Sequence, residues 1–425
     1  MTIGAASLFA GRIALGADNV TNPYGTGNIN VITGGAGGSS VYVNRPGSVW
    51  NNRFFLAANG EGRGAIRAEQ GGTFNGDIIL TANASISSDG SATTTTLNGN
   101  ISGAFTLTLG GQTGANAANK YVLTGNNVHS ATTVGLGITN IDHDVALGSY
   151  NGTVTIHGNA TLQAGAAGII LNPDHTIAMT GGASGPHHID TQANHMTIQG
   201  VITGAATESL VKAGSGKLTL TGANTFSGAT TIHAGTLEAG APGALGSTAS
   251  VAVNTGGTLL LSGAGDRIND SAAFTLSGGT FHTAGLSETV GALTLSASSI
   301  IDLGAGASVL RFADSSALTW TGTLSIWNWS GNPAIGGGTD QLFFGNGSGP
   351  GLTASQLMQV KFYSDAGATI LPYAPGFSAF TGGFGEVVPV PEPSSVVVGL
   401  ALCGLAGWRE RRKSQARRRE SRCAA

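Results

Sequence analysis

The segment Gly216–Gly240 has the sequence Gly-Lys-Leu-Thr-Leu-Thr-Gly-Ala-Asn-Thr-Phe-Ser-Gly-Ala-Thr-Thr-Ile-His-Ala-Gly-Thr-Leu-Glu-Ala-Gly. Leu218 and Leu220 alternate with polar residues, which is the period of a β-strand with one buried face. Glycines mark the places where the chain must turn, at Gly222, Gly228 and Gly235. The segment therefore predicts short strands separated by tight turns.

The same unit recurs in weaker form along the chain. Tyr121–Val134 follows Leu218–Ile232 with one residue missing, and Asn151–Gly165 follows Ser227–Gly240 with one residue added. Looser versions occur at Gly76–Ser85, Ser102–Gly111 and Ser250–Gly263. Imperfect repeats of this size, built from strands and turns, predict the coils of a parallel β-solenoid. We assign residues 1–325 to this repeat region.

The strongest repeat, residues 198–240, resembles the autotransporter-associated β-strand repeat of bacterial passenger domains. Passenger domains of that family are secreted and form right-handed β-helices. The resemblance therefore implies an all-β fold, a right-handed parallel β-helix, for the repeat region.

Composition supports an ordered all-β chain. Glycine accounts for 70 of 425 residues and proline for 12, without the triplet period of collagen. A hydrophobic content of 41% excludes a disordered chain. The aromatic-rich stretch 326–385 differs from the repeats, and we expect it to form a C-terminal β cap or small β subdomain on the last coil.

The last part of the chain, residues 386–425, is organised differently. Glu386–Pro393 ends in the triplet Pro391, Glu392 and Pro393, which cannot continue a helix or a sheet ladder and predicts an extended linker. Residues 394–408 are uncharged, and as a helix they span about 22 Å, short of the roughly 30 Å of a bilayer core. The tail 409–425 holds eight Lys/Arg against two Glu and predicts a cytoplasmic stop signal, which begins with Arg409, Arg411, Arg412 and Lys413.

This order of triplet, apolar run and arginine cluster closely resembles the PEP-CTERM sorting signal of Gram-negative, exopolysaccharide-making bacteria. The resemblance implies that an exosortase-type membrane enzyme is a partner and processes the protein for export or attachment. It also implies a transient membrane anchor through a single short C-terminal helix. Met1–Ala17 is a poor secretory signal because Arg12 interrupts its apolar residues, so we expect an upstream segment.

Net charge and cysteine content further limit the classes of partner that the protein can bind. Without the basic tail, the body has 11 basic and 20 acidic residues, a net charge of about −9. Nucleic-acid binding needs clustered Lys/Arg, so nucleic acid is excluded as a partner. The two cysteines, Cys403 and Cys423, both lie in the sorting region, so the body has no disulfide and no thiolate metal site.

Three groups of residues are candidates for a catalytic or metal-binding site. The acidic residues Asp142, Asp144, Asp174 and Asp190 have almost no basic neighbours in sequence, which argues against catalysis. Six of the nine histidines fall between His143 and His195, but their spacing matches no zinc motif. The loop Gly336–Leu342 faintly resembles a calcium-binding nonapeptide, yet it occurs once, and such sites need consecutive copies. We therefore expect no catalytic residues, no metal site and no cofactor.

The sequence favours an exported structural or adhesive rod at the cell surface or in the extracellular matrix, where polysaccharide is the natural partner. The alternative is a carbohydrate-active enzyme, a lyase or hydrolase, on the same scaffold. A groove lined by carboxylates and aromatic residues would favour the enzyme, and continuous Thr/Ser ladders would favour the rod.

Overall fold

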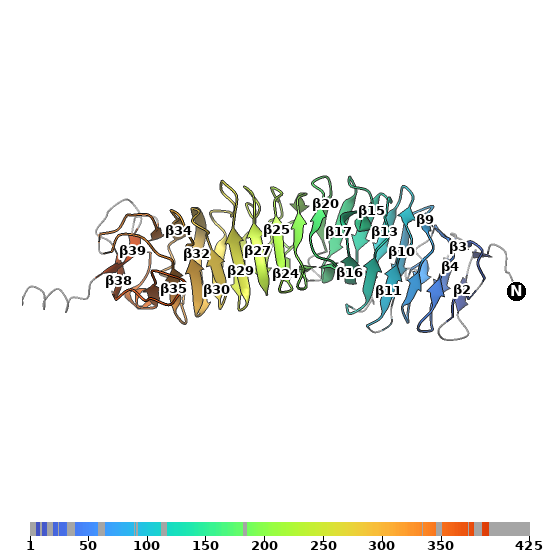
Figure 1. Ribbon diagram of the computed structural model, residues 1–425, viewed down its shortest axis with the longest axis horizontal. Helices are drawn as coiled ribbons and strands as arrows, with labels where there is room; N and C mark the ends of the chain where they lie inside the picture. Colours follow the sequence, from blue (N-terminus) through green and yellow to red (C-terminus); the bar gives the residue numbers. More distant parts are fainter. Residues whose placement is uncertain are drawn as a thin grey trace, which may run out of the picture.

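The computed structural model describes residues 6–8, 11–14, 20–23, 25–31, 39–57, 64–88, 90, 92–111, 117–181, 185–333, 335–345, 351–372, 374–377 and 385–390. These residues form a right-handed β-solenoid, drawn out along one axis with the first strands at one end and the last at the other (Figure 1). The predicted parallel β-helix is confirmed. The chain passes over three sides in a fixed order, and strands of successive turns pair in parallel along each side.

Side 1 is built from a five-stranded and a nine-stranded parallel sheet. The first contains β1 (Ala6–Leu8), β3 (Ile29–Val31), β6 (Phe54–Leu56), β9 (Ile78–Leu80) and β12 (Ile101–Ser102). The second contains β19 (Ile169–Leu171), β22 (Met196–Ile198), β25 (Lys217–Leu220), β27 (Gly235–Ala239), β29 (Gly257–Leu261), β31 (Thr280–His282), β33 (Ser299–Asp302), β35 (Leu324–Trp327) and β37 (Val360–Phe362). Between them, the short 3-10 helix η1 (Asp144–Leu147) contacts β19.

Side 2 begins with a nine-stranded parallel sheet. Its strands are β2 (Gly11–Ala14), β4 (Ser39–Tyr42), β7 (Ile66–Arg67), β10 (Ala84–Ser87), β13 (Thr106–Leu109), β15 (Ala131–Val134), β17 (Thr153–His157), β20 (Thr176–Thr180) and β23 (Ile202–Thr203). Between β23 and β32 (Glu288–Ala297) the described chain has no strand on this side, and contacts such as the hydrogen bond from Ile202 N to Asn224 Oδ1 (2.8 Å) join its successive turns there.

Side 3 starts the sixteen-stranded sheet. Its strands are β5 (Val49–Trp50), β8 (Gly72–Phe74), β11 (Thr94–Leu97), β14 (Lys120–Leu123), β16 (Gly137–Ile141), β18 (Ala160–Ala164), β21 (His187–Asp190), β24 (Leu210–Ala213), β26 (Ala229–Ile232), β28 (Ser250–Asn254), β30 (Ala273–Ser277) and β32 (Glu288–Ala297). The second half of β32 pairs with β30, while its first half pairs with β34 (Val309–Ala313), which pairs in turn with β36 (Gln341–Phe344). The sheet therefore crosses through β32 back to side 2.

The C-terminal end differs from the stack. Two antiparallel strands, β39 (Gly385–Val390) and β38 (Ala374–Phe377), extend the sheet beyond β36. Parallel pairing itself continues past residue 325 through β36 and β37, so a separate cap over 326–385 is not confirmed. We expected Glu386–Pro393 to be an exposed linker, but Glu386 to Val390 belong to β39, because Val387 and Val388 are fully buried against the end of the core.

Helix is almost absent from the described residues, where α1 (Ala354–Leu357) and η1 are each a single turn. Neither is long enough to cross a bilayer, and no other described segment is helical and apolar enough to do so. The predicted membrane helix, residues 394–408, lies outside the described residues.

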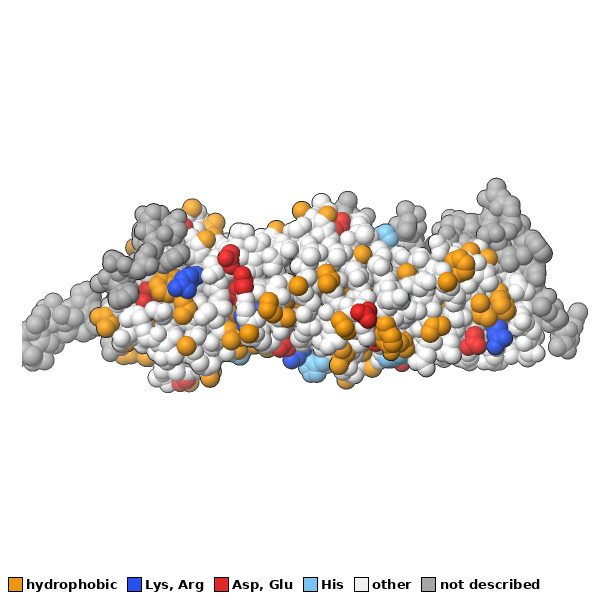
Figure 2. Space-filling view, turned by 90° about the horizontal axis from the view of Figure 1, so that it is seen from above, with side chains coloured by type: hydrophobic (Ala, Val, Ile, Leu, Met, Phe, Trp, Pro, Cys, Tyr) orange, Lys and Arg blue, Asp and Glu red, His pale blue; other side chains and the backbone are white. Residues whose placement is uncertain are grey.

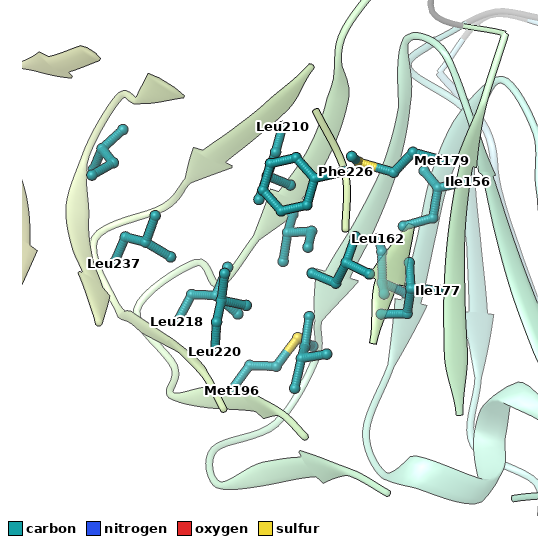
Figure 3. Packing of buried hydrophobic residues seen from close by; sticks show 14 of the residues in the cluster. Ile156, Leu162, Ile177, Met179, Met196, Leu210, Leu218, Leu220, Phe226 and Leu237 are labelled. Carbon is teal, nitrogen blue, oxygen red and sulfur yellow. The ribbon is translucent and has the colours of Figure 1, made fainter. Parts of the chain in front are cut away.

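One apolar core runs inside the three sides. Figure 3 shows Leu218 and Leu220 of side 1 pointing toward Leu210 of side 3 and Phe226 of side 2. Phe226 is 1% exposed and fills the core where side 2 has no strand. The predicted alternation in Leu218 and Leu220 is confirmed, because both are fully buried while the residues between and before them are partly exposed.

The two strongest repeats use one corner design on different sides. Asn224 accepts from Ile202 N and donates through Nδ2 to Ala244 O (2.8 Å). Asn127, its counterpart in the repeat, accepts from Ile101 N (2.7 Å) and donates to Ala146 O (2.7 Å). Each side chain therefore joins the turn before it to the turn after it. The first corner lies on side 2 and the second on side 1.

Glycine at these corners is required by close approach of neighbouring turns. A Cβ added to Gly222 would lie 2.4 Å from Gly200 O, and one added to Gly228 would lie 2.3 Å from Glu208 O. Neither glycine has a positive φ, so the constraint is steric.

We predict that Gly222→Val and Gly228→Val each lower the free energy of unfolding by about 1–3 kcal/mol, because the turns must separate to admit the side chain. Gly256→Asn is the matched control, since Gly256 has φ +81° but no atom within 4 Å of an added Cβ, and asparagine tolerates this conformation. Thermal melting measures all three. Unchanged melting of both valine variants would show that the corners are misplaced.

Candidate functional site

The predicted sorting residues cannot be placed. Pro391, Glu392 and Pro393 and the basic residues Arg409, Arg411, Arg412 and Lys413 lie outside the described residues. The described chain ends with Val390 in β39, directly before the triplet.

The histidines singled out in the sequence do not converge. His175 and His187 are fully buried: His175 Nε2 lies 3.3 Å from Asp144 Oδ1, and His187 Nε2 lies 3.1 Å from Glu208 Oε2. His143 pairs with Asp142 beside it in sequence. Each of these three histidines thus has its own partner, and within the described chain no three potential ligands that include a histidine come close enough to share an ion.

The pKa values of two buried histidines are shifted in opposite directions by their surroundings. Burial lowers the pKa of His129 to about 4, and the nearby His175 adds to the shift. Burial also disfavours the charged form of His175, but hydrogen bonds to Asp144 and to Gly152 O outweigh it and raise its pKa. Both side chains are parts of the interior rather than of an exposed metal site.

The glycine-rich loop Gly336–Leu342, at the start of β36, makes contacts that hold neighbouring parts of the fold together. Asp340 is fully buried, and its carboxylate accepts from Ser308 N (3.0 Å) and from both the N and the hydroxyl of Ser330 (2.8 and 2.7 Å). Gly337 N donates to Glu386 Oε2 at 2.7 Å. The loop therefore joins β36 and β39 to the preceding turn.

The candidate site is a group of residues that the sequence did not identify. One carboxylate oxygen from each of Asp266, Asp270 and Glu288 lies within 4.8 Å of the others. Asp266 and Asp270 are exposed on the strandless part of side 2, and Glu288, 5% exposed, begins β32 on the following turn. In the sequence, Asp266 and Glu288 are two carboxyl residues that lie one turn of the solenoid apart. Because turn lengths vary, such a pair is difficult to recognise before the structure is known.

These residues line the first of two adjoining hollows. The first has a volume of about 270 Å³ and is lined by Gly265, Asp266, Asp270, Ser287, Glu288, Thr289, Val309 and Arg311. The second, of about 390 Å³, is lined by Asp270, Thr289, Val290, Arg311, Phe312, Ala313, Asp314 and Gly345. Because they share Asp270, Thr289 and Arg311, they form one depression along side 2, which we call the acidic groove.

Two arginines shape this groove. Arg267, 2% exposed, donates to the carbonyls of Ser262 (2.7 Å) and Gly263 (2.6 Å), and its Nη1 lies 3.7 Å from Glu288 Oε2. Arg311 lies over the ring of Phe343, with 4.7 Å from Cζ to the ring centroid. Arg267 thus fixes the backbone around Asp266, while Arg311 lines the groove beside the ring of Phe343.

The local environment changes the acidity of Glu288. Burial is the largest cause, and the hydrogen bond and charge of Asp266 add to it, raising the pKa of Glu288 to about 8 against the opposing effect of Arg267. A carboxyl group that keeps its proton near neutral pH can donate it. Three carboxylates this close can also bind a hard divalent cation, although Arg267 already supplies positive charge at Glu288.

We predict that Glu288 makes the protein less stable as pH rises from about 4.5 to about 8. The folded state retains the Glu288 proton over this range while the unfolded state has lost it, so folding is favoured at the acidic end. In Glu288→Gln this fall in the melting temperature should be reduced.

Glu238→Gln is the control with the opposite sign. Burial alone would raise the pKa of Glu238, but hydrogen bonds from Lys217, Ser262 and Thr219 hold it below its ordinary 4.5. Its stabilisation is therefore lost below about pH 4.5, outside the range tested for Glu288. Identical pH profiles for Glu288→Gln and the parent between pH 4.5 and 8 would contradict the assignment.

Comparison with known proteins identifies part of the chain. Residues 210–239 match the family model described as the Passenger-associated-transport-repeat. No curated protein and no solved structure matches the chain. The matched segment runs from β24 to β27 and contains the corner glycines Gly222 and Gly228. The repeat and the β-helical fold fit a secreted or surface protein of a Gram-negative bacterium.

Proposed function

We propose that this protein is an exported structural rod, associated with the cell surface or the extracellular polysaccharide matrix and sorted through a PEP-CTERM signal. The observation that supports it best is the continuous core inside three sides whose outward residues are mostly uncharged and polar. A stiff solenoid of this kind offers long faces for weak contacts that add up along its length.

Exposed polar ladders illustrate this surface. Asn75 Nδ2 donates to Asn51 Oδ1 and Asn98 Nδ2 donates to Asn75 Oδ1, both at 2.9 Å, and Thr124 continues the column to Asn98 Oδ1 at 2.8 Å. The hydrogen bonds fix these side chains from turn to turn. An ordered polar surface loses little conformational entropy when it binds a partner.

The polar body and the basic tail also support the sorting part of the proposal. The body has a net charge of about −9, whereas the tail concentrates eight basic residues that are costly to move across a bilayer. The body would then lie outside and the tail inside until an exosortase-type enzyme removes it near Pro391–Pro393.

We predict that changing Glu392 and Pro393 to alanine keeps the full-length chain in the membrane. These residues follow the last described strand, so the change should leave the melting temperature unaltered. Glu410→Ala, in the tail but outside the triplet, is the control and should be processed normally. Blotting membrane and released fractions for tags at both ends measures processing. A C-terminal tag that persists on surface-exposed parent protein would contradict the processing.

A second candidate, a carbohydrate-active enzyme, is favoured by the acidic groove. Glu288, with a pKa of about 8, can act as general acid on a glycosidic oxygen, and Asp266 or Asp270 supplies the second carboxyl. The closest oxygens of the three carboxyls lie within 4.8 Å of one another, and Asp266 is hydrogen-bonded to Glu288, so these carboxyls are closer together than the roughly 6.5–9.5 Å of inverting glycosidases.

If the acidic groove is an active site, the protein should release reducing ends from a matrix polysaccharide. The rate of this release should fall at least about 100-fold in Glu288→Gln, which removes the general acid. Asp174→Asn changes an exposed carboxyl on a distant turn and should retain full activity. Parent protein that releases no reducing ends from neutral or anionic polysaccharides, while remaining folded, would leave the structural rod as the function.

A further inference from the structure

The outward face of side 2 between β10 and β23 has a regular array of hydroxyl groups. In-register pairing aligns successive outward residues into two columns. One column contains Ser85, Thr108, Thr133, Thr155, Ala178 and Thr203; the other contains Thr106, Ala131, Thr153 and Thr176. Neighbours within a column are about 4.8 Å apart, and the columns are about 6.6 Å apart, because alternate residues of a strand face the same way.

This array lacks formal charge, unlike the other two sides. Side 1 has Lys217, Glu238 and Asp302 on its outward face, and side 3 has Lys120 and Asp190. The outward positions of β10, β13, β15, β17, β20 and β23 include no Asp, Glu, Lys or Arg. Figure 2 shows how thinly charged side chains are spread over one face of the rod.

His157, at the edge of the array, is the one titratable residue among these outward positions. Burial and the nearby His187 hold its pKa below the ordinary 6.5. It is therefore neutral at neutral pH, so the array presents hydroxyl and methyl groups without charge.

We propose that this threonine array binds an extended, neutral, linear polysaccharide laid along the rod. Threonine suits such a partner because its methyl group packs on the C–H face of a sugar while its hydroxyl exchanges hydrogen bonds with the sugar's own. A charged polymer would gain nothing from a face without counter-charges. Repetition along the rod turns individually weak contacts into useful avidity.

The course of side 2 supports an extended polymer. From β23 the side passes through Asn224 to Ala244, and the neighbouring Leu245 pairs with Ile268 between Asp266 and Asp270. The threonine array and the acidic groove thus occupy the same side of the rod. A chain bound on the array would run toward the groove, whereas a small compact ligand would need no such continuity.

This inference deepens the proposed function and rests on surface exposure of the rod. Its test is co-sedimentation of the full-length protein with microcrystalline cellulose and with chitin, both insoluble, linear and neutral. We expect the parent to sediment with at least one. Thr133→Lys combined with Thr155→Lys, two residues paired across adjacent turns, should weaken that binding about tenfold.

The control places the same change on side 1. Thr258 and Thr280 are likewise outward and paired across adjacent turns, so Thr258→Lys with Thr280→Lys should bind like the parent. Circular dichroism shows whether each variant is folded, and antibody labelling of intact cells shows whether it is displayed. Parent protein that is displayed but sediments with neither polymer, or equal loss in both double variants, overturns the inference and leaves surface display standing.

Discussion

Backbone contact between successive turns is the constraint on which this structure depends. Each turn donates its hydrogen bonds to the next, so the chains must approach closely at the corners as well as along the strands. A Cβ on Gly99 would lie 2.1 Å from Gly76 O, and one on Gly125 would lie 2.3 Å from Gly99 O. The three glycines thus stack through consecutive turns. Two such corners, at Gly125 and Gly222, lie two residues before the buried Asn127 and Asn224.

The same constraint explains why the surface is ordered without many charges. Parallel pairing in register places like residues above one another, so Asn and Thr form ladders where charged residues would repel. Charged residues that point inward form hydrogen bonds within the fold, as Lys212 shows. Its ammonium donates to the carbonyls of Ala213 and Gly214 at 2.8 Å and of Ala234 at 3.1 Å. The positive charge of Lys212 is therefore satisfied by backbone carbonyls inside the fold.

The solenoid could be predicted from the sequence, whereas the position of each strand on the three sides could not. Alternation in Leu218 and Leu220 and glycine at the corners are local signals, and both appear as expected. Yet equivalent corners, at Asn127 and Asn224, lie on different sides, because turns differ in length. Contacts between adjacent turns join residues 19 positions apart in one place and 32 in another.

The same variation hid the acidic groove. Residues such as Asp142 and Asp190 attracted attention because acidic residues and histidines are dense there, but each has a separate partner. Asp266 and Glu288 come together only once the turn length between them is known, and the burial that raises the pKa of Glu288 is a property of packing. The linker prediction was wrong over Glu386 to Val390 for a similar reason, since the pairing of β39 with β36 is a long-range contact.

Location on the cell tests the central claim most directly. The chain has two cysteines, Cys403 and Cys423, both in the sorting region, so a cysteine placed at Thr258, outward on side 1 and outside the threonine array, is unique in the body. Intact cells would be treated with a membrane-impermeant maleimide and then lysed. The account predicts labelling of Thr258→Cys on intact cells and none of the parent. Labelling of the parent on intact cells, or of Thr258→Cys only after lysis, would contradict it.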